Sequence, residues 1–240
     1  LQQELEANRS TEKYLAMQKQ RARLPAFERQ EEIVQAIRDH QVVVISGSTG
    51  CGKTTQIPQF VLDAEIAAGR GACCNIICTQ PRRISAIGVA ERVASEKAEP
   101  LGKTVGYQIR LERRACDDTK LLFCTTGILL RRLAGDPLLS GVSHVFLDEV
   151  HERNSNSDFS LIILRDLLKV RSDLRVVLMS ATLNAATFAN YFAGPSGSSV
   201  PVPTLHIPGF TFPVQDFYLE DALQVTGHQP THRGGRRGSG

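Results

Sequence analysis

The sequence predicts an α/β fold in which helices cover both faces of a doubly wound, mostly parallel sheet. Short apolar runs of strand length alternate with longer segments of helical spacing, as expected for successive strand–helix units. A glycine-rich segment at residues 47–54 follows one apolar run and precedes a helical segment. Two carboxylates, Asp148 and Glu149, follow another apolar run. Because ligands bind beyond the carboxyl ends of the strands in such sheets, we expect these segments at one edge.

The composition is that of an ordinary globular protein. Of the 240 residues 42% are hydrophobic, enough to bury one large core, and the net charge of +3 is too small to indicate a nucleic-acid partner by itself. The six cysteines lack paired CxxC spacing, which favours reduced, buried residues of an intracellular protein over a disulfide framework or a zinc site. We expect the cytoplasm or the nucleus, with an organelle as the alternative. No apolar run approaches the ~20 residues that a membrane span needs.

Each predicted element follows from its local pattern. Residues 1–23 are rich in Glu, Gln, Lys and Arg, which predicts a polar, solvated helical extension. After the break at Leu24 and Pro25, the helical spacing of Ile33, Val34 and Ile37 predicts a helix over residues 27–38. The predicted strands are residues 42–45, 75–79, 105–109, 121–124, 145–147 and 176–179, and the further predicted helices are residues 55–68, 84–97, 157–169 and 185–192.

These elements predict one folded domain, residues 24–220, between two extensions. Within it, residues 194–203 are dense in Ser, Gly and Pro and predict a flexible surface loop. Residues 221–240 end in a Gly/Arg-rich tract that cannot bury enough apolar surface to fold. We therefore expect a disordered tail, or a linker into a second domain, at this end.

The segment at residues 47–54 fits the phosphate-binding pattern GxxxxGK[ST] between a strand and a helix, where that pattern has a physical meaning. Glycines let successive backbone N–H groups wrap an anion, and the helix that opens at Lys53 adds its positive dipole end. Lys53 would reach the β and γ phosphates of ATP, and the Thr54 hydroxyl would ligate Mg²⁺. A glycine-rich turn that matches by chance is the alternative. The candidate nucleotide-binding residues are Gly47, Ser48, Thr49, Gly50, Cys51, Gly52, Lys53 and Thr54.

The carboxylates of Asp148 and Glu149 supply the second chemical element. An apolar strand that ends in two acidic residues is typical of a Walker B segment. Asp148 would hold Mg²⁺ through bound water, with Glu149 next to the same ion, and Glu149 could orient and deprotonate the water that attacks the γ phosphate. Taken alone, such a pair is more often part of a solvated loop, and His151 alone is more often a surface histidine than a metal ligand.

Five segments together resemble the DEAH/RHA group of superfamily 2 helicases, and the resemblance extends over nearly all of residues 24–220. They are similar to motifs I, Ia, Ib, II and III in order and spacing, at residues 47–54, 79–86, 125–131, 148–153 and 180–182. The segment at residues 206–214 resembles the corresponding segment of the RNA helicase A-like branch, which includes G-quadruplex-resolving members. Motif II has Val150 where Ala or Ile is commoner, and we expect this side chain to pack inward with little effect on the chemistry.

The resemblance implies a RecA-like P-loop domain that uses ATP and Mg²⁺. It implies catalytic roles for Lys53, Glu149 and His151. It also implies that His151 couples the nucleotide state to the nucleic-acid path, together with Ser180, Ala181 and Thr182.

The same resemblance implies roles for several arginines. Arg92 would stack on the nucleotide base, as a guanidinium plane can on any purine. The partner would be RNA, with DNA or a G-quadruplex as alternatives, held by its phosphate backbone without sequence readout. The residues implied in these contacts are Arg82, Arg83, Thr125, Thr126 and Gly127. Without the resemblance, Arg82, Arg83 and Arg92 would be interpreted as solvated surface charges.

Helicases of this group hydrolyse ATP between two RecA-like domains, and the second domain supplies arginine fingers. The sequence after residue 219 does not resemble such a second half, so we expect the chain alone to bind ATP and RNA weakly and to unwind nothing. Two alternatives to a helicase motor stay open. One is a P-loop enzyme of another kind, and the other is a catalytically silent module that binds nucleic acid.

Overall fold

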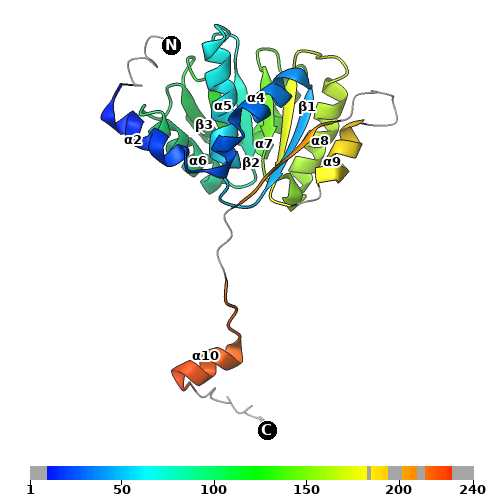
Figure 1. The fold of residues 1–240 in the computed structure, drawn as a ribbon. Helices are drawn as coiled ribbons and strands as arrows, with labels where there is room; N and C mark the ends of the chain where they lie inside the picture. Colours follow the sequence, from blue (N-terminus) through cyan, green and yellow to red (C-terminus); the bar gives the residue numbers. More distant parts are fainter. Residues whose placement is uncertain (1–9, 183–184, 194–201, 210–213, 229–240) are drawn as a thin grey trace, which may run out of the picture. The chain divides into compact units, whose positions relative to one another are not determined.

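The computed structural model describes residues 10–182, 185–193, 202–209 and 214–228, and the chain divides into two compact units, Leu1–Phe210 and Thr211–Gly240. The first unit carries the sheet and all of the predicted site residues (Figure 1). In the second unit the described residues form helix α10, Leu219–Thr226. The Asp221 carboxylate accepts a hydrogen bond from the backbone N–H of Tyr218 (2.9 Å) at the start of α10, and Gly227 follows its end in the left-handed conformation.

Counted over the described residues, the first unit has an eight-stranded sheet in the order β4-β3-β5-β2-β6-β7-β1-β8. Neighbouring strands run parallel, except that β3 and β4 form an antiparallel pair. This arrangement confirms the predicted mostly parallel α/β sheet. The strands are β1 (Val42–Gly47), β2 (Ile76–Gln80), β3 (Val105–Ile109), β4 (Glu112–Arg114), β5 (Leu121–Thr125), β6 (His144–Leu147), β7 (Arg175–Ser180) and β8 (Thr204–Ile207).

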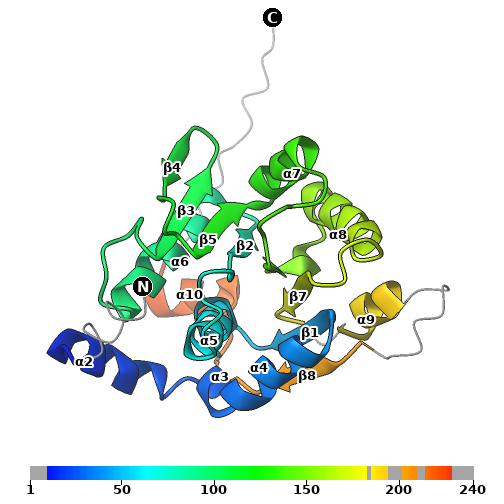
Figure 2. The same ribbon diagram turned by 90° about the horizontal axis from the view of Figure 1, so that it is seen from above.

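Helices cover both faces of this sheet. Helices α4, α5 and α6 pack on one face and α7, α8 and α9 on the other, as Figure 2 shows from above. The helices are α2 (Glu12–Arg21), α3 (Pro25–Glu28), α4 (Gln30–Asp39), α5 (Lys53–Ala67), α6 (Arg83–Glu96), α7 (Thr126–Gly135), α8 (Ser155–Leu167) and α9 (Ala185–Ala193), with a 3₁₀ turn, η1, at Val150–Glu152.

The central strands are apolar on both sides, and this places them in the middle of the unit. Every residue of β1 and β2 is buried, as expected for parallel strands covered on both faces. Alternate side chains enter opposite cores. Val43 and Ile45 belong to the core under α4, α5 and α6, whereas Val42 and Val44 belong to the core under α7, α8 and α9. The carboxyl ends of these strands therefore meet at one edge of the sheet.

The structure differs from the sequence predictions in several elements. The helix predicted over residues 27–38 is divided into α3 and α4 at Arg29, whose guanidinium donates a hydrogen bond to the carbonyl oxygen of His206 next to β1. Thr125 ends β5 and α7 begins at Thr126, so the predicted contacts at residues 125–127 come from a strand end and the first turn of a helix. The sequence patterns did not predict β4, α7 or β8. The prediction of a solvated helical extension is incomplete, because Arg21 at the end of α2 is buried.

Part of the predicted disordered tail is helical, since α10 extends to Thr226. Residues 194–201 of the predicted surface loop, 210–213 of the segment at 206–214, and 229–240 of the predicted tail lie outside the described residues. Among the helices that the structure describes, none combines the length and the apolar character that a membrane crossing requires.

Candidate functional site

The glycine-rich segment lies between β1 and α5, as the phosphate-binding pattern requires. Gly52 has a φ of +94°, in the left-handed region that other residues rarely adopt, and α5 begins at the next residue. Gly47 is needed for a different reason, because a Cβ there would lie 2.6 Å from the carbonyl oxygen of Ile207 in β8. The backbone at these two positions thus accepts glycine and little else, and it leaves the N-terminus of α5 at the loop.

Lys53 is buried at the first position of α5. Its Nζ donates hydrogen bonds to the carbonyl oxygens of Gly47 (2.5 Å) and Ser48 (3.1 Å). Thr49 and Gly50 are exposed at the tip of the loop, whereas Cys51 is fully buried beneath it. The lysine cation is therefore held inside the loop, where it can meet a bound phosphate.

Asp148 is buried just after β6, and three donors hold its carboxylate. Oδ2 accepts hydrogen bonds from Thr54 Oγ1 (2.5 Å) and Gln80 Nε2 (2.7 Å), and Oδ1 accepts one from the backbone N–H of Glu149 (2.8 Å). Burial raises the pKa of Asp148, and the hydrogen bonds from Thr54 and Gln80 oppose this rise. The fold thus brings the hydroxyl of the loop and the carboxylate after β6 into direct contact.

The donor set at this contact fits Mg²⁺. This ion binds hard oxygen ligands and is usually held by one or two carboxylates together with substrate phosphates and water. The Thr54 hydroxyl and the Asp148 carboxylate offer two such oxygens beside the loop. The Glu149 side chain lies instead near His151, with Oε2 3.4 Å from Nδ1 of that ring.

His151 links the acidic segment to the turn after β7. Its Nδ1 accepts a hydrogen bond from the backbone N–H of Ala181 (3.2 Å), and Ser180 Oγ accepts one from the backbone N–H of Thr182 (3.1 Å) within that turn. A single nitrogen cannot accept from Ala181 and donate to Glu149 at the same time. Protonation at Nδ1 would therefore exchange the first contact for the second. Glu149 itself has a left-handed backbone (φ 54°), which is uncommon outside glycine and frequent at functional sites.

Arg92 lies on α6 with about half of its side chain exposed, at 49%. Its Nε donates a hydrogen bond to Oε1 of Glu96, one turn further along the helix (2.7 Å). Glu96 is buried and also accepts a hydrogen bond from Gln56, which lies one turn beyond Lys53 in α5. Arg92 is thus connected to the first turns of the helix that opens at the loop.

Several of the predicted nucleic-acid contacts line one hollow of about 400 Å³ beyond the ends of β3 and β5. Its basic lining residues are Arg83, Arg110 and Arg131, and none of its described lining residues is acidic. The full lining is Pro81, Arg83, Arg110, Thr125, Thr126, Gly127, Ile128, Arg131, Asn154 and Asn156. The N-terminus of α7 therefore faces a basic hollow, a combination that suits a phosphate group.

Arg82 does not line this hollow. Its Nη2 lies 3.0 Å from Oε1 of Glu152 in η1, and 73% of its side chain is exposed. Such exposed ion pairs contribute only about 0–1 kcal/mol, so Arg82 could exchange this partner for a phosphate at little cost.

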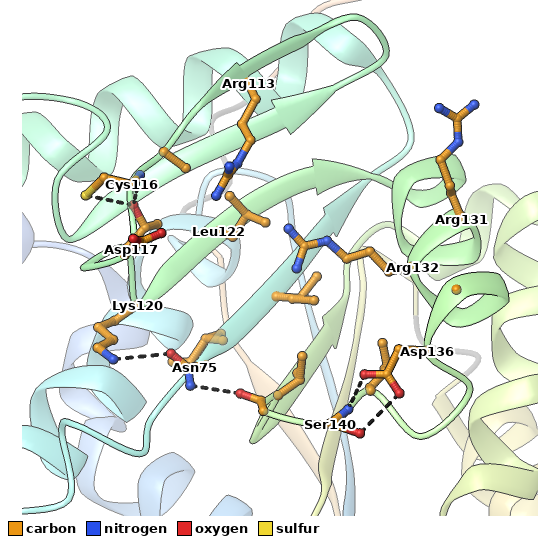
Figure 3. Close-up of a pocket in the computed structure, with 18 residues that line it drawn as sticks. Asn75, Arg113, Cys116, Asp117, Lys120, Leu122, Arg131, Arg132, Asp136 and Ser140 are labelled. Carbon is orange, nitrogen blue, oxygen red and sulfur yellow. Dashed lines mark hydrogen bonds between the residues drawn. The ribbon is translucent and has the colours of Figure 1, made fainter.

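A larger hollow of about 480 Å³ extends from the amino ends of β2 and β5 to α7 and shares Arg131 with the basic hollow (Figure 3). Asn75 and Lys120, which precede β2 and β5, line it, and the guanidinium groups of Arg113 and Arg132 point into it. Arg132 Nη2 also donates a hydrogen bond to Gln108 Oε1 (2.8 Å). None of the predicted site residues lines this hollow, so volume alone does not identify the functional site.

Comparison with known protein families matches residues 27–190 to the DEAD/DEAH box helicase family. The chain belongs to the DEAD/DEAH box helicase family. The matched range contains the glycine-rich loop, the acidic pair, and the turn after β7. The resemblance found in the sequence motifs is thereby confirmed.

Individual relatives point to the DExH-box members of the DEAD/DEAH box helicase family. The chain is similar to the DExH-box ATP-dependent RNA helicases DExH1 (54% identity, all of this chain) and DExH3 (57% identity, 88% of this chain) of Arabidopsis thaliana. It is also similar to the human ATP-dependent DNA/RNA helicase DHX36 (51% identity, 97% of this chain). The chain spans 24%, 17% and 23% of the lengths of these three relatives.

Sequence reasoning missed several residues of this helicase domain. Gln80, which holds Asp148, is the last residue of β2, and Arg110 directly follows β3, so their positions at strand ends could have indicated them. Arg131 lies in the segment at residues 125–131 but received no role, because α7, which directs it to the hollow, was not predicted. Glu96 reads as an ordinary polar residue near the end of an amphipathic helix, and only the packing of α5 against α6 shows that it is buried.

Proposed function

We propose that this chain is the ATP-binding motor domain of a DExH-box RNA helicase, which hydrolyses ATP to unwind or remodel nucleic acid when joined to a second RecA-like domain. The contact between Thr54 and Asp148 carries the proposal, because it joins a hydroxyl of the phosphate loop to a carboxylate from a different strand at the place where Mg²⁺ would be held. The names of the relatives, ATP-dependent RNA or DNA/RNA helicases, support the choice of ATP and RNA.

Binding of ATP is proposed to depend on the positive end of α5. The N-terminus of this helix and the loop amides would bind the phosphate oxygens, and the buried Lys53 cation would add a full charge. When bound with the nucleotide, Mg²⁺ would neutralise phosphate charge, held by Thr54 and Asp148. Each of these groups is already positioned by hydrogen bonds, so little ordering is needed on binding.

Glu149 is the proposed general base for the attacking water. Burial is the main cause that raises its pKa, and the neighbouring Asp148 carboxylate raises it further. A carboxylate with a raised pKa takes up a proton more readily near neutral pH than an ordinary one. Its left-handed backbone also supports this role, because strain of this kind is retained where a side chain must be directed.

Coupling between nucleotide and nucleic acid is proposed to pass through His151. Its ring lies between Glu149, beside the proposed attacking water, and the backbone of Ala181 after β7. A change in the charge near Glu149 would alter which partner His151 Nδ1 prefers, and this would move the turn made by Ser180, Ala181 and Thr182.

Nucleic acid is proposed to cross the basic hollow at the start of α7. Arg83, Arg110 and Arg131 would contact phosphates, and the α7 backbone amides at Thr126 and Gly127 would contact another. Contacts of this kind position a strand without reading its sequence. They suit a helicase that acts on many sequences.

Lys53→Ala tests the nucleotide site. In a titration of the full chain with Mg²⁺ and a nonhydrolysable ATP analogue, we expect affinity to fall by at least about tenfold, since a charge-assisted contact is lost. The exposed Lys169, paired with Asp166 on α8, gives a matched control, because Lys169→Ala removes the same charge away from the loop. RNA affinity without nucleotide should be unchanged in both variants. A wild-type chain that binds RNA but no ATP would favour the silent nucleic-acid-binding module instead.

A further inference from the structure

The Glu96 carboxylate lies between three helices. It belongs to α6, is 1% exposed, and faces α5 and the end of α2. A buried carboxylate is tolerated only when donors satisfy its oxygens. The two carboxylate oxygens of Glu96 have different hydrogen-bond partners: one bonds to Arg92 on α6 and the other to side chains of α5.

One oxygen of Glu96 holds Arg92, the residue that the resemblance to helicases implies would stack on the nucleotide base. Oε1 accepts the hydrogen bond from Arg92 Nε (2.7 Å). This bond fixes the guanidinium at one corner, while about half of the Arg92 side chain stays exposed. A guanidinium held in this way loses less conformational entropy when a flat base lies on it.

The other oxygen of Glu96 is held from α5 and α2. Oε2 accepts hydrogen bonds from Gln59 Nε2 (2.7 Å) and Gln56 Nε2 (2.9 Å), and Arg21 Nε lies 3.8 Å away. Arg21 is 3% exposed and donates from the same Nε to Gln56 Oε1 (2.7 Å). Two cations, Arg21 and Arg92, thus flank one buried carboxylate.

The chain that follows α2 reaches the back of the phosphate loop. The backbone N–H of Ala26 donates a hydrogen bond to the carbonyl oxygen of Cys51 (3.0 Å). Leu24 packs against Gly52, where an added Cβ would lie 3.2 Å from Leu24 Cδ1. Residues 21–26 therefore touch both the loop and the carboxylate that holds Arg92.

We propose that Glu96 is a positioning residue for the nucleotide base, and that α2 acts through Arg21 to hold it in place. The proposal rests on the proposed function, because it takes ATP as the ligand and Arg92 as the residue that meets its base, as the resemblance to helicases implies. Helix α2 would then contribute to the nucleotide site through Arg21. It sets the affinity for the base of ATP and leaves the affinity for the phosphates to the loop.

The test compares two ligands that differ in the base and ribose. Dissociation constants of the full chain are measured with Mg²⁺ for a nonhydrolysable ATP analogue and for inorganic tripolyphosphate, by calorimetry. In Glu96→Gln, we expect the preference for the nucleotide over tripolyphosphate to fall by about three- to tenfold, with tripolyphosphate affinity unchanged. Arg21→Met should reduce the same preference for the nucleotide. It serves as a second test of the proposal if Glu96→Gln does not fold.

A double variant separates positioning from general support. Arg92→Lys keeps the charge but loses the planar group, so it should lower the nucleotide preference by itself. Since Glu96 acts through Arg92, adding Glu96→Gln to Arg92→Lys should cause little further loss. Independent, additive losses would overturn the proposal, as would equal losses of affinity for both ligands.

The Asp63–Lys97 ion pair provides a matched control. It also joins α5 to the end of α6, with Nζ to Oδ1 at 2.6 Å and Lys97 3% exposed, but it does not contact Arg92. Lys97→Met should therefore lower the melting temperature without changing the nucleotide preference. If Lys53→Ala abolishes binding of both ligands but Glu96→Gln leaves their ratio at the wild-type value, the proposed function stands and this inference fails. If the wild-type chain binds neither ligand, the proposed function fails.

Discussion

At the scale of single residues, Asp148 shows how a functional group can weaken the fold that holds it. Asp148 is 3% exposed, and its pKa is raised because burial outweighs the hydrogen bonds from Thr54 and Gln80. The folded protein therefore binds a proton at Asp148 more tightly than the unfolded chain does. By linkage, stability falls as the pH rises through this raised pKa, and at neutral pH the charged carboxylate destabilises the fold.

Asp148→Asn is expected to raise the melting temperature at neutral pH and to abolish Mg²⁺-dependent ATP binding. Asn is close in size and can still bond to Thr54 and Gln80 after their polar groups turn, but it carries no charge. Because wild-type Asp148 becomes protonated as the pH falls through its raised pKa, the stability gap between the two proteins should close toward acid pH. Scanning calorimetry over a pH series measures this gap.

Asp166→Asn is a control in which the pKa of the replaced carboxylate is shifted in the opposite direction. The exposed Asp166 has its pKa lowered by the hydrogen bond from Lys169, so its charged form favours the fold above the unfolded pKa. This variant should show no gain in melting temperature at neutral pH. A lower melting temperature for Asp148→Asn than for the wild type would contradict the linkage derived from Asp148.

At the scale of elements, β8 supports the glycine-rich loop from the edge of the sheet. It pairs in parallel with β1, with Gly47 opposite Ile207. The close approach at this point excludes a Cβ from Gly47. The conformation of the loop therefore depends on a strand that lies about 160 residues later in the sequence, as the Gly47–Ile207 pairing shows.

Gly47→Ala should lower both the stability of the domain and its affinity for ATP. The added Cβ meets a backbone carbonyl oxygen, which can move only if β8 shifts away from β1. Strain of this kind costs about 1–3 kcal/mol. Chemical denaturation and a nucleotide titration measure the two effects.

Gly88→Ala is the matched control, since Gly88 lies in the middle of α6 and an added Cβ would have no heavy atom within 4 Å. There the same substitution should stabilise the domain by about 0.5–1 kcal/mol. If both alanines change stability in the same direction, the contact between Gly47 and Ile207 does not explain the need for glycine.

The sequence patterns predicted those elements that have an apolar period. Strands such as β1 and β7 are continuous apolar runs because helices cover both of their faces. By contrast, β4 is fully exposed and charged, and it forms only because the chain returns beside β3. In β8, one residue of four is buried, so no period of two emerges. The local hydrophobic pattern cannot predict strands that form only because they pair with a neighbouring strand.

The site was predictable to the extent that its chemistry lies within short motifs. Lys53 and Asp148 stand in segments whose residues and order indicate their chemistry, and the fold brings both segments to one edge. The role proposed for Arg21 had no such signal. Its carboxylate partner, Glu96, is 75 residues away in sequence, and a buried arginine at the end of a polar helix has the same sequence pattern as an exposed one.

At the scale of the whole molecule, charge is placed locally and not as a general excess. The net charge is only +3, yet Arg83, Arg110 and Arg131 gather at one hollow and form no ion pair among the described residues. Other arginines are neutralised, as Arg70 is by Glu65 and Arg153 by Asp158. These three guanidinium groups at the carboxyl edge are therefore available to bind a polyanion.

Removing these charges should change the salt dependence of RNA binding. If each of Arg83, Arg110 and Arg131 neutralises one phosphate of a single strand, the triple alanine variant should reduce the slope of log affinity against log salt by about 2. Fluorescence anisotropy with an unstructured RNA over a salt series measures this slope. The Lys169→Ala variant should keep the wild-type slope, and an unchanged slope in the triple variant would remove the hollow from the RNA path.

The position of β8 has a mechanical consequence. Gly209, just beyond this strand, lies so close to Ser48 that a Cβ there would collide with it. Tension on the polypeptide past this point would therefore reach the glycine-rich loop before it reaches the interior of the sheet. An edge strand of four residues, bonded along one side only, is also where a sheet peels most easily under load. A pull on the chain beyond β8 would thus act first on the glycine-rich loop at Ser48.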